Sequence, residues 1–306
     1  MATFSKSFYK VNKYTNGRYQ YNPLLVKRLV GYHRGIPSNV MDLAVDVATG
    51  TGILARQLSS FFTKVLGTDA SESMLHAARQ SEMDRTIEAV QKKNKDEGMT
   101  QNNNIEYLVE NAEEMNSIEN NTADVLTIAQ AAHWLNPDKF LSECKRVLKK
   151  DGTLMIIGYS GYGHFVDFPQ CDEILREFGT LKLGRYWNDG VGILDHLYST
   201  YYEKVNQHGF KDVKYQVFPE AYTKYANRHG ETLDLPLVID HQFTWKSWIE
   251  HINSWSAIAK YQTSHPEEKE LAEDFVKKLM CVAGVADINS TFRFQWPQVI
   301  ILCRNS

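Results

Sequence analysis

The sequence of 306 residues contains little of what marks several large classes of protein. Its four cysteines lie far apart and form no Cys-x-x-Cys pair: Cys144, Cys171, Cys281 and Cys303. This spacing argues against a zinc site and is typical of reduced thiols in an intracellular protein. No apolar run approaches the ~18 residues of a membrane span, and the first seven residues contain no apolar signal segment. We therefore expect a soluble cytoplasmic protein with no metal and no membrane partner.

An excess of charge of either sign is also missing. The sequence has 34 Lys and Arg residues against 37 Asp and Glu residues, a net charge of −3. Its one basic cluster, Gln-Lys-Lys-Asn-Lys at residues 91–95, is followed at once by Asp96 and Glu97. A nucleic-acid-binding protein needs a one-sided basic surface, because phosphate contacts dominate its affinity. We therefore expect no nucleic-acid partner.

What the sequence does contain is a regular alternation of strand-like and helix-like segments over residues 23–159. Apolar runs predict buried strands, and several segments between them have helical spacing. The predicted strands are Leu43–Ala48, Lys64–Asp69, Ile105–Val109, Asp124–Ala129 and Thr153–Gly158, and the predicted helices are Pro23–Tyr32, Ile53–Phe62, a helix opened by Ser71, and Asp138–Leu148. This alternation predicts an α/β fold with a doubly wound, mainly parallel, Rossmann-like sheet.

The whole chain is predicted to form one domain over residues 1–306, because 43% hydrophobic content suffices for a full core. Residues 1–35 would form an arm and a helix, and residues 36–159 the cofactor-binding core. Residues 160–208 and 220–290 are rich in aromatics and are predicted as largely helical insertions over the ligand site. Residues 210–218 and 291–303 alternate apolar and polar side chains, as late antiparallel strands do, and would bring the sheet to seven strands. The polar stretch Lys92–Asn104 is predicted as a surface loop.

The segment Asp46-Val-Ala-Thr-Gly-Thr-Gly52 lies directly after the first predicted strand and directly before a helix. Its glycines let the backbone approach a ligand closely, and Gly50 can take a positive φ. The carboxylate of Asp46 supplies a fixed anion where a cationic amino group would sit. The second strand ends in Asp69, which is placed to bind both hydroxyls of a ribose. An amino acid joined to a nucleoside is S-adenosylmethionine, so the segment is predicted to bind this methyl donor.

The same turn leaves a second cofactor open. Residues 50–55, Gly-Thr-Gly-Ile-Leu-Ala, also fit the Gly-x-Gly-x-x-Ala fingerprint of NAD- and FAD-binding proteins. A dinucleotide turn needs a free helix N-terminus for its pyrophosphate, and Asp46 would place an anion close by. Ala48 stands where many methyltransferases have glycine. Ala48, Gly50 and Gly52 are counted with Asp46 among the predicted cofactor residues.

Residues after the later strands are further candidates for the cofactor site. The Asp69 carboxylate has a simpler alternative role, since it would also cap the next helix. Asn111 would lie beside the adenine, where its amide can hydrogen-bond the ring edge, and a plain N-cap at Asn111 is the alternative. The predicted cofactor residues outside the turn are Asp69, Ala70, Met74, Asn111, Ala112, Gln130 and, from the N-terminal arm, Tyr14 and Arg18.

The pair His133-Trp134 follows the fourth predicted strand, where the reactive methyl group would lie. His133 is predicted to orient an acidic acceptor by hydrogen bonding, and Trp134 to wall the pocket and shield it from water. An isolated His-Trp pair in the core or on the surface is the simpler alternative. Further candidates for the acceptor pocket are Tyr159, Trp187 and Trp255, whereas Trp245 and Trp248 are expected in the core.

Before the first helix, an aromatic arm contains Tyr14, Arg18, Tyr19 and Tyr21. A flexible arm with one arginine suits a lid that folds over a small anionic ligand. A solvated tail is the alternative.

Together these residues resemble the class I S-adenosylmethionine-dependent methyltransferases. The resemblance covers nearly the whole chain and narrows to the fungal group that contains trans-aconitate methyltransferase and the cantharidin-detoxifying methyltransferase. The segments that carry it are Ala-His-Trp-Leu at 132–135, Lys-Asp-Gly-Thr-Leu at 150–154, Gly158-Tyr159, Asp-Phe-Pro at 167–169, Leu-Gly-Arg-Tyr-Trp at 183–187, and Trp248 with Ser-Trp-Ser at 254–256. The family's Arg-Pro-x-Tyr-Pro arm becomes Arg-Tyr-Gln-Tyr-Asn at residues 18–22, without its prolines.

The resemblance implies that Asp69 holds the ribose and that Asp46, Gly50 and Gly52 lie along the methionine part of the cofactor. It also implies transfer of a methyl group to a carboxylate of a small organic acid, giving a methyl ester. A carboxylate with a pKa around 4 is already ionised near pH 7, so no strong general base is required. Alignment and removal of water can supply ~7–11 kcal/mol of such a barrier. Arg18 and His133 are the residues predicted to hold carboxylates of cofactor or substrate.

The acceptor and the assembly stay open at this stage. A tricarboxylic acid, a fatty or terpenoid acid and a xenobiotic diacid all fit the resemblance, and a monomer or weak homodimer is expected. Two other functions are the alternatives: an NAD-dependent oxidoreductase on a similar sheet, and a non-catalytic regulator that keeps the cofactor pocket.

Overall fold

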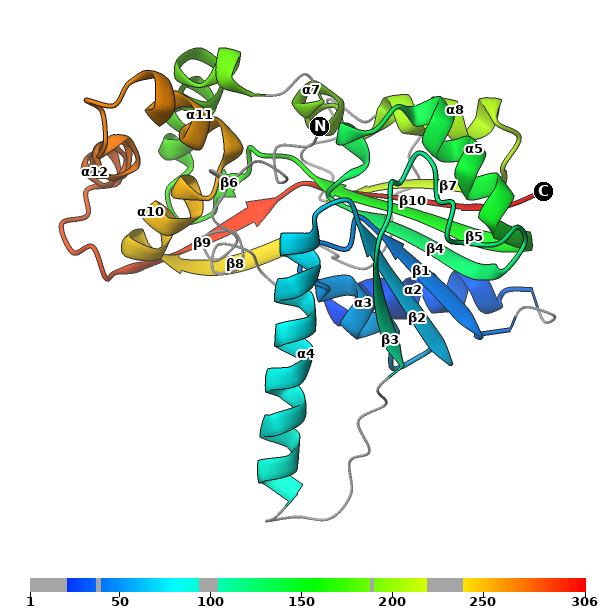
Figure 1. Ribbon diagram of the computed structural model, residues 1–306. Coiled ribbons are helices and arrows are strands. Elements are labelled where there is room, and N and C mark those ends of the chain that lie inside the picture. Colours follow the sequence, from blue (N-terminus) through cyan, green and yellow to red (C-terminus); the bar gives the residue numbers. More distant parts are fainter. Residues whose placement is uncertain (1–20, 37–39, 94–103, 188–189, 219–238) are drawn as a thin grey trace.

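The computed structural model of the protein describes residues 21–36, 40–93, 104–187, 190–218 and 239–306, and the structural statements below concern these residues. Its main element is a seven-stranded sheet with the order β3-β2-β1-β4-β5-β10-β7 (Figure 1). The strands are β1 (Leu43–Val47), β2 (Lys64–Asp69), β3 (Ile105–Val109), β4 (Ala123–Ala129), β5 (Leu148–Tyr159), β7 (Lys211–Phe218) and β10 (Gln298–Arg304). The first five pair in parallel, and β10 runs antiparallel to both of its neighbours. The predicted doubly wound, mainly parallel sheet is confirmed.

Helices cover both faces of this sheet, because its central strands are apolar on both sides. On one face, Ala44 of β1 belongs to a core with side chains of α2 and α3. On the other face, Val45 and Val47 belong to a core with side chains of α5 and α8. The helices are α2 (Pro23–Arg34), α3 (Ile53–Leu58), α4 (Glu72–Lys93), α5 (Pro137–Val147) and α8 (Ser199–Gln207). The carboxyl ends of β1, β2 and β4 therefore share one edge, where open α/β sheets bind their ligands.

Some element bounds differ from the predictions. α3 ends at Leu58 rather than Phe62. α4 runs to Lys93, so Lys92 lies in a helix and not in the predicted loop; residues 94–103 of that loop lie outside the described residues. β5 begins at Leu148, because Leu148 pairs with Ala123 before the register of β4 and β5 shifts.

The predicted strand over residues 291–303 is wrong in one respect: it is two strands in two different sheets. β9 (Thr291–Trp296) and β10 are separated by Pro297, which lacks the N–H that a continuous ladder would need. β9 pairs with β6 (His164–Phe165) and β8 (Ile239–Thr244) in a three-stranded antiparallel sheet. Strands β6 and β8 fall within the insertions predicted as largely helical, so these insertions are mixed.

Short helices of the insertions pack on the three-stranded sheet around an aromatic core. Trp245 and Trp248 are fully buried in this core, as predicted, and Phe165 stacks on Trp245 with ring centroids 6.1 Å apart. These helices are α6 (Asp172–Glu177), η4 (Phe178–Lys182), η5 (Gly184–Tyr186), α10 (Trp245–Asn253), α11 (Ser256–Ser264) and α12 (Leu271–Ala283). A further short helix of the insertions, α7 (Val191–Asp195), contacts β5 and belongs to the core of the main sheet. Figure 1 shows α10, α11 and α12 with β8 and β9 set to one side of the main sheet.

Candidate active site

The turn after β1 has the backbone that a close-fitting ligand requires. Ala48, Gly50 and Gly52 all have positive φ, at 51°, 59° and 78°. A Cβ at Gly50 would meet no atom within 4 Å, so this glycine faces open space, whereas a Cβ at Gly52 would overlap the Tyr107 hydroxyl. Thr49 N donates to Thr68 O of β2 at 2.8 Å and ties the turn to the neighbouring strand. The open backbone at Gly50 fits the amino-acid part of S-adenosylmethionine.

Asp46 lies beneath the turn and is buried. Its two carboxylate oxygens accept hydrogen bonds from Thr49 Oγ1 at 2.6 Å and from Thr127 Oγ1 at 2.7 Å. Burial raises the pKa of Asp46 to about 6, against the opposing effect of these two hydrogen bonds. The carboxylate thus joins the turn to β4 and places a buried acidic group next to the turn.

Asp69 ends β2 directly beside the glycine turn. Its carboxylate accepts from Gly50 N at 3.0 Å and from Ser71 N at 2.8 Å. It therefore caps the following turn, which is the simpler role considered for this residue, and it also braces the glycine loop. Ribose binding by Asp69 stays a prediction. Burial raises the pKa of Asp69, and the two backbone donors oppose that rise. Ala70 is exposed beside it, and Met74 is buried in the first turns of α4.

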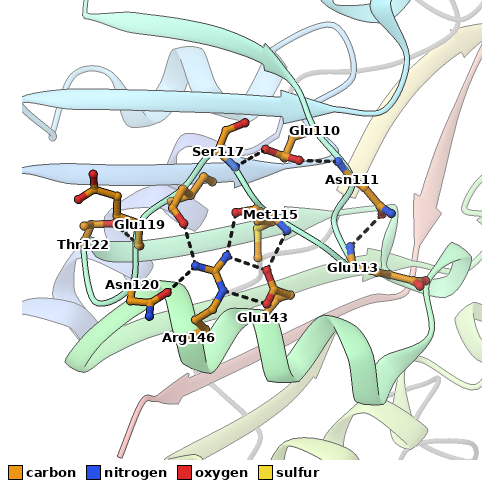
Figure 2. Close-up of polar contacts among 11 residues, drawn as sticks. Glu110, Asn111, Glu113, Met115, Ser117, Glu119, Asn120, Thr122, Glu143 and Arg146 are labelled. Carbon is orange, nitrogen blue, oxygen red and sulfur yellow. Dashed lines mark hydrogen bonds and ion pairs between the residues drawn. The ribbon is translucent and has the colours of Figure 1, made fainter.

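The loop after β3, residues 110–122, is held by a network that the sequence did not reveal (Figure 2). The Arg146 guanidinium donates to Met115 O at 2.8 Å, to Ile118 O at 2.8 Å and to Asn120 Oδ1 at 2.7 Å. Glu143, which pairs with Arg146 at 2.7 Å, accepts from Met115 N at 2.8 Å. The network therefore joins α5 to this loop on both sides of Met115.

The same loop carries the residues expected beside the adenine. Asn111 Oδ1 accepts from Glu113 N at 3.0 Å in a local turn. No helix begins at Asn111, so the plain N-cap considered as the alternative role for this residue is wrong. Ala112 is buried against the core. Asn111 is exposed at the start of the loop and remains available for a ligand as well.

The acceptor residues predicted from sequence come together in one cavity. His133 and Trp134 from η2 (Ala132–Trp134), Tyr159 from β5, Trp187 and Trp255 all line it, although they span residues 133–255. Gln130 also lines the cavity, but both ends of its amide bond the backbone of Tyr159, at 3.0 and 2.9 Å.

Several lining residues were not foreseen. Except for Ser254, which belongs to the Ser-Trp-Ser segment of the family resemblance, they lie in no motif: Tyr162, Leu194, Asp195, His251, Ser254 and Trp296. Only the tertiary packing of β5, α7, α10 and β9 brings them to the same cavity. The cavity walls are mainly aromatic, with rings of Trp187 and Trp255 5.5 Å apart and rings of Tyr159 and Trp296 6.3 Å apart.

The hydrogen bonds around His133 determine which ring nitrogen carries the proton. Nδ1 lies 2.8 Å from the hydroxyl of Tyr198, a fully buried side chain. Burial raises the pKa of Tyr198 far above its usual range, and backbone N–H groups of His133 and Ala132 face the hydroxyl oxygen. We therefore assign the hydroxyl as the donor in its contact with Nδ1. His133 is then neutral with its proton on Nε2, an assignment that rests on the network.

Tyr14 and Arg18, predicted to act from the N-terminal arm, lie outside the described residues. Among the described residues, no group of three or more His, Cys, Asp or Glu side chains is arranged to hold a metal ion. Within the same ranges, no helix is both long and apolar enough to cross a membrane.

Similarity to known proteins bears on the same site. Residues 45–156, which contain the turn, Asp69, Asn111 and His133, match the family model of a methyltransferase domain. The Saccharomyces cerevisiae protein CRG1, named a probable S-adenosylmethionine-dependent methyltransferase, is 24% identical over 300 residues, covering 95% of this chain and 94% of the yeast protein. The ubiquinone/menaquinone biosynthesis C-methyltransferase UbiE of Hydrogenovibrio crunogenus is 34% identical over 128 residues, 40% of this chain and 43% of UbiE.

A solved structure shares the fold. A protein from Anaeromyxobacter dehalogenans, provisionally assigned as a type II methyltransferase, superposes with a TM-score of 0.63 at 19% identity, covering 94% of this chain and 97% of that one. These similarities do not favour the NAD-dependent oxidoreductase or the non-catalytic regulator. The sheet order and the glycine turn agree with the match of residues 45–156 to a methyltransferase domain, and the activity that these findings support is methyl transfer from S-adenosylmethionine.

Proposed function

We propose that this methyltransferase O-methylates a carboxylate of a small organic acid and releases a methyl ester. The observation that carries the proposal is the 2.8 Å contact between Nδ1 of His133 and the buried hydroxyl of Tyr198, in which we assign the hydroxyl as the donor, so that Nε2 bears a proton. A histidine in this form donates a hydrogen bond from Nε2 and cannot remove a proton there. It suits an acceptor oxygen that is already ionised.

The carboxylate requires no base, so the residues around it need only bind and align it. S-adenosylmethionine, when bound along the glycine turn, supplies an activated methyl group on sulfur. The Nε2–H of His133 would donate to one carboxylate oxygen and leave the other oxygen to attack in line. The aromatic walls from Trp134, Tyr159 and Trp255 exclude water from the methyl group.

The size of the cavity supports a small acceptor. Its volume is about 80 Å³, below the roughly 300 Å³ at which drug-sized ligands begin to fit. A trans-aconitate-like acid or a xenobiotic diacid, the substrates that the family resemblance implies, would enter with one carboxylate at His133. Arg18 would hold a carboxylate from the arm, and its part in the site stays a prediction, as do the cytoplasmic location and the monomeric or weakly dimeric state.

The test is a panel of organic acids incubated with methyl-radiolabelled S-adenosylmethionine and scored for a base-labile methyl ester. The expected result is label released by mild base from at least one small acid. His133→Ala should lower kcat/KM for that acid at least tenfold, while His133→Gln, which retains an N–H donor, should recover part of it. Label that appears only in base-stable ethers or amines would overturn the proposal.

A further inference from the structure

The acceptor cavity contains an acid group that carboxylate methylation does not need. Of the described residues that line the cavity, Asp195 alone is acidic, and none is Lys or Arg. Asp195 ends α7 and faces the cavity together with Tyr162, Leu194 and the aromatic walls. A second anion in the acceptor would be repelled by this carboxylate.

The environment of Asp195 leaves it ionised and short of partners. Ser160 Oγ lies 3.4 Å from Oδ1, a long hydrogen bond, and the backbone of Gly161 faces the carboxylate. Burial raises the pKa of Asp195 to about 6, opposed by Ser160 and Gly161 and by the more distant charges of His196 and Arg176. No described cation lies within ion-pair distance of it, and Arg176 is 3.9 Å from Glu173 instead.

Asp195 also stands at the junction of two cavities. It and Tyr162 line both the acceptor cavity and a neighbouring one of about 200 Å³, whose other walls include Arg176, Thr180 and His196. Because the acceptor cavity is small and is lined by both His133 and Asp195, an acceptor held at His133 has its other end within reach of Asp195. Its carboxylate therefore meets the end of the acceptor that is remote from His133.

We propose that Asp195 determines the acceptor class by accepting a hydrogen bond from an O–H or N–H group at the remote end of the acid. This inference rests on the proposed carboxylate methylation. It narrows the substrate to acids that carry a hydrogen-bond donor, such as a hydroxy acid or an amino acid. The Asp195 carboxylate has only a long side-chain hydrogen bond, from Ser160, so a ligand that supplies a further donor is favoured over one that does not. Within the proposed function, this places hydroxy and amino acids ahead of trans-aconitate-like acids and diacids, because a second ionised carboxylate beside Asp195 is disfavoured by like charge.

The test compares acids of equal length that differ only at the remote end. 4-Hydroxybutanoate and 4-aminobutanoate are compared with butanedioate, and the corresponding six-carbon acids form a second set. The wild-type enzyme should prefer the donor-bearing acids over the diacid by at least tenfold in kcat/KM for ester formation. Comparison of the hydroxy acid with the amino acid shows whether Asp195 prefers an O–H or an N–H donor.

Asp195→Asn supplies the decisive variant, because its amide offers an N–H donor and no charge. It should lower kcat/KM for the amino acid most, raise that for the diacid, and so reduce the preference at least tenfold. Glu203→Gln on the exposed side of α8 removes the same charge away from the cavity and should leave the preference unchanged. Circular dichroism of both variants checks that they fold.

Binding of the same acids to the S-adenosylhomocysteine complex, measured by calorimetry, keeps this test separate from that of the proposed function. If no acid is esterified but the donor-bearing acids bind better than the diacids, carboxylate methylation fails and the role of Asp195 stands. The role of Asp195 is overturned if the wild type prefers the diacids, if no donor-bearing acid binds, or if Asp195→Asn weakens all acids equally. A preference for the six-carbon diacid that Arg176→Gln abolishes would assign the remote group to Arg176 instead.

Discussion

The cofactor side and the acceptor side of this enzyme are built from different kinds of group. On the cofactor side, backbone N–H groups and short polar side chains of Asp46, Thr49, Asp69 and Thr127 hold one another at distances of 2.6–3.0 Å. On the acceptor side, large rings from β5, η2, α10 and β9 form the walls, and the polar groups His133 and Asp195 stand among them.

The two sides therefore depend on different properties of the chain. The cofactor side depends on the path of the backbone, so one added Cβ atom or one lost hydrogen bond changes its shape. The acceptor side depends on side-chain volume and on the protonation of one histidine, so its shape can vary while the cofactor side is conserved in form. The mutations below should affect one side and leave the other intact.

The largest effect is expected from Gly52→Ala. The new methyl group meets the Tyr107 hydroxyl, and φ of 78° is a conformation that costs a non-glycine residue about 1–2 kcal/mol. With overpacking of ~1–3 kcal/mol added, we expect at least a hundredfold loss of S-adenosylmethionine affinity by calorimetry. Gly31→Ala in α2, where a Cβ meets nothing within 4 Å, is the matched control. An unchanged affinity of Gly52→Ala for S-adenosylmethionine would show that the turn accommodates a Cβ atom without losing the binding site.

Tyr198→Phe should act on the acceptor side alone. Without the hydroxyl, Nδ1 of His133 loses the donor that fixes its tautomer, and kcat/KM should fall ~10–100-fold, the size typical of a lost catalytic positioning contact. The affinity for S-adenosylmethionine should stay within about twofold. Tyr215→Phe removes another buried hydroxyl, which donates to Leu197 O at 2.9 Å, and should cost similar stability with no change in kcat/KM. Equal losses of activity in the two variants would contradict the role of His133.

The buried Asp46 should make the stability of the cofactor side depend on pH. The pKa of Asp46 is about 6 in the folded protein, whereas an aspartate side chain has an ordinary pKa of 3.8. Between these two pH values the folded state therefore binds more protons than the unfolded state. The contribution of Asp46 to the free energy of unfolding therefore falls as pH rises from about 4 to about 6, by ~2–3 kcal/mol. Urea titrations of wild type and Asp46→Asn at several pH values isolate this contribution. A difference between the two proteins that stays constant over the window would rule it out.

Arg146→Lys tests the loop beside the expected adenine position. Lysine keeps the charge but cannot donate in the fork that reaches Met115, Ile118 and Glu143 together. We expect KM for S-adenosylmethionine to rise about tenfold, roughly the loss of one charge-assisted hydrogen bond, with kcat changed less than twofold. Lys277→Gln, in an exposed pair on α12, serves as the control. A fall in kcat at unchanged KM would assign Arg146 to the acceptor side.

The smallest effect is a gain. Ala48 has φ of 51°, where glycine is the favoured residue, and Ala48→Gly relieves this strain. The free energy of unfolding should rise by up to ~1 kcal/mol, as seen by thermal denaturation, with no change in acceptor preference. Alanine in place of the glycine found in many methyltransferases therefore lowers the stability locally, and the turn still forms. A lower melting temperature would contradict this reading of the backbone.

Much of the cofactor side could be predicted from the sequence because its residues follow directly from strand ends. The strands ending at Asp69 and Val109 begin and end where the apolar runs do, and the glycine turn occupies seven consecutive residues. The hydrogen bonds of Arg146 to the loop could not be predicted, since two of them go to the backbone carbonyl groups of Met115 and Ile118, whose positions do not depend on side-chain type. The break between β9 and β10 could have been predicted from Pro297. Nothing in the sequence indicates that the two strands belong to different sheets.

The sequence by itself determined the fold class, the glycine turn and the placement of His133 and Trp134 at the end of β4, because each depends on short-range patterns of burial and backbone freedom. Only the tertiary structure decided that Asp195, Tyr162, His251 and Trp296 join them in one cavity, and that Tyr198 sets the proton of His133. The residues brought to His133 in this way lie from 29 positions (Tyr162) to 163 positions (Trp296) away from it along the chain. Their distances follow from how the two sheets and the insertion helices pack, which no local pattern encodes.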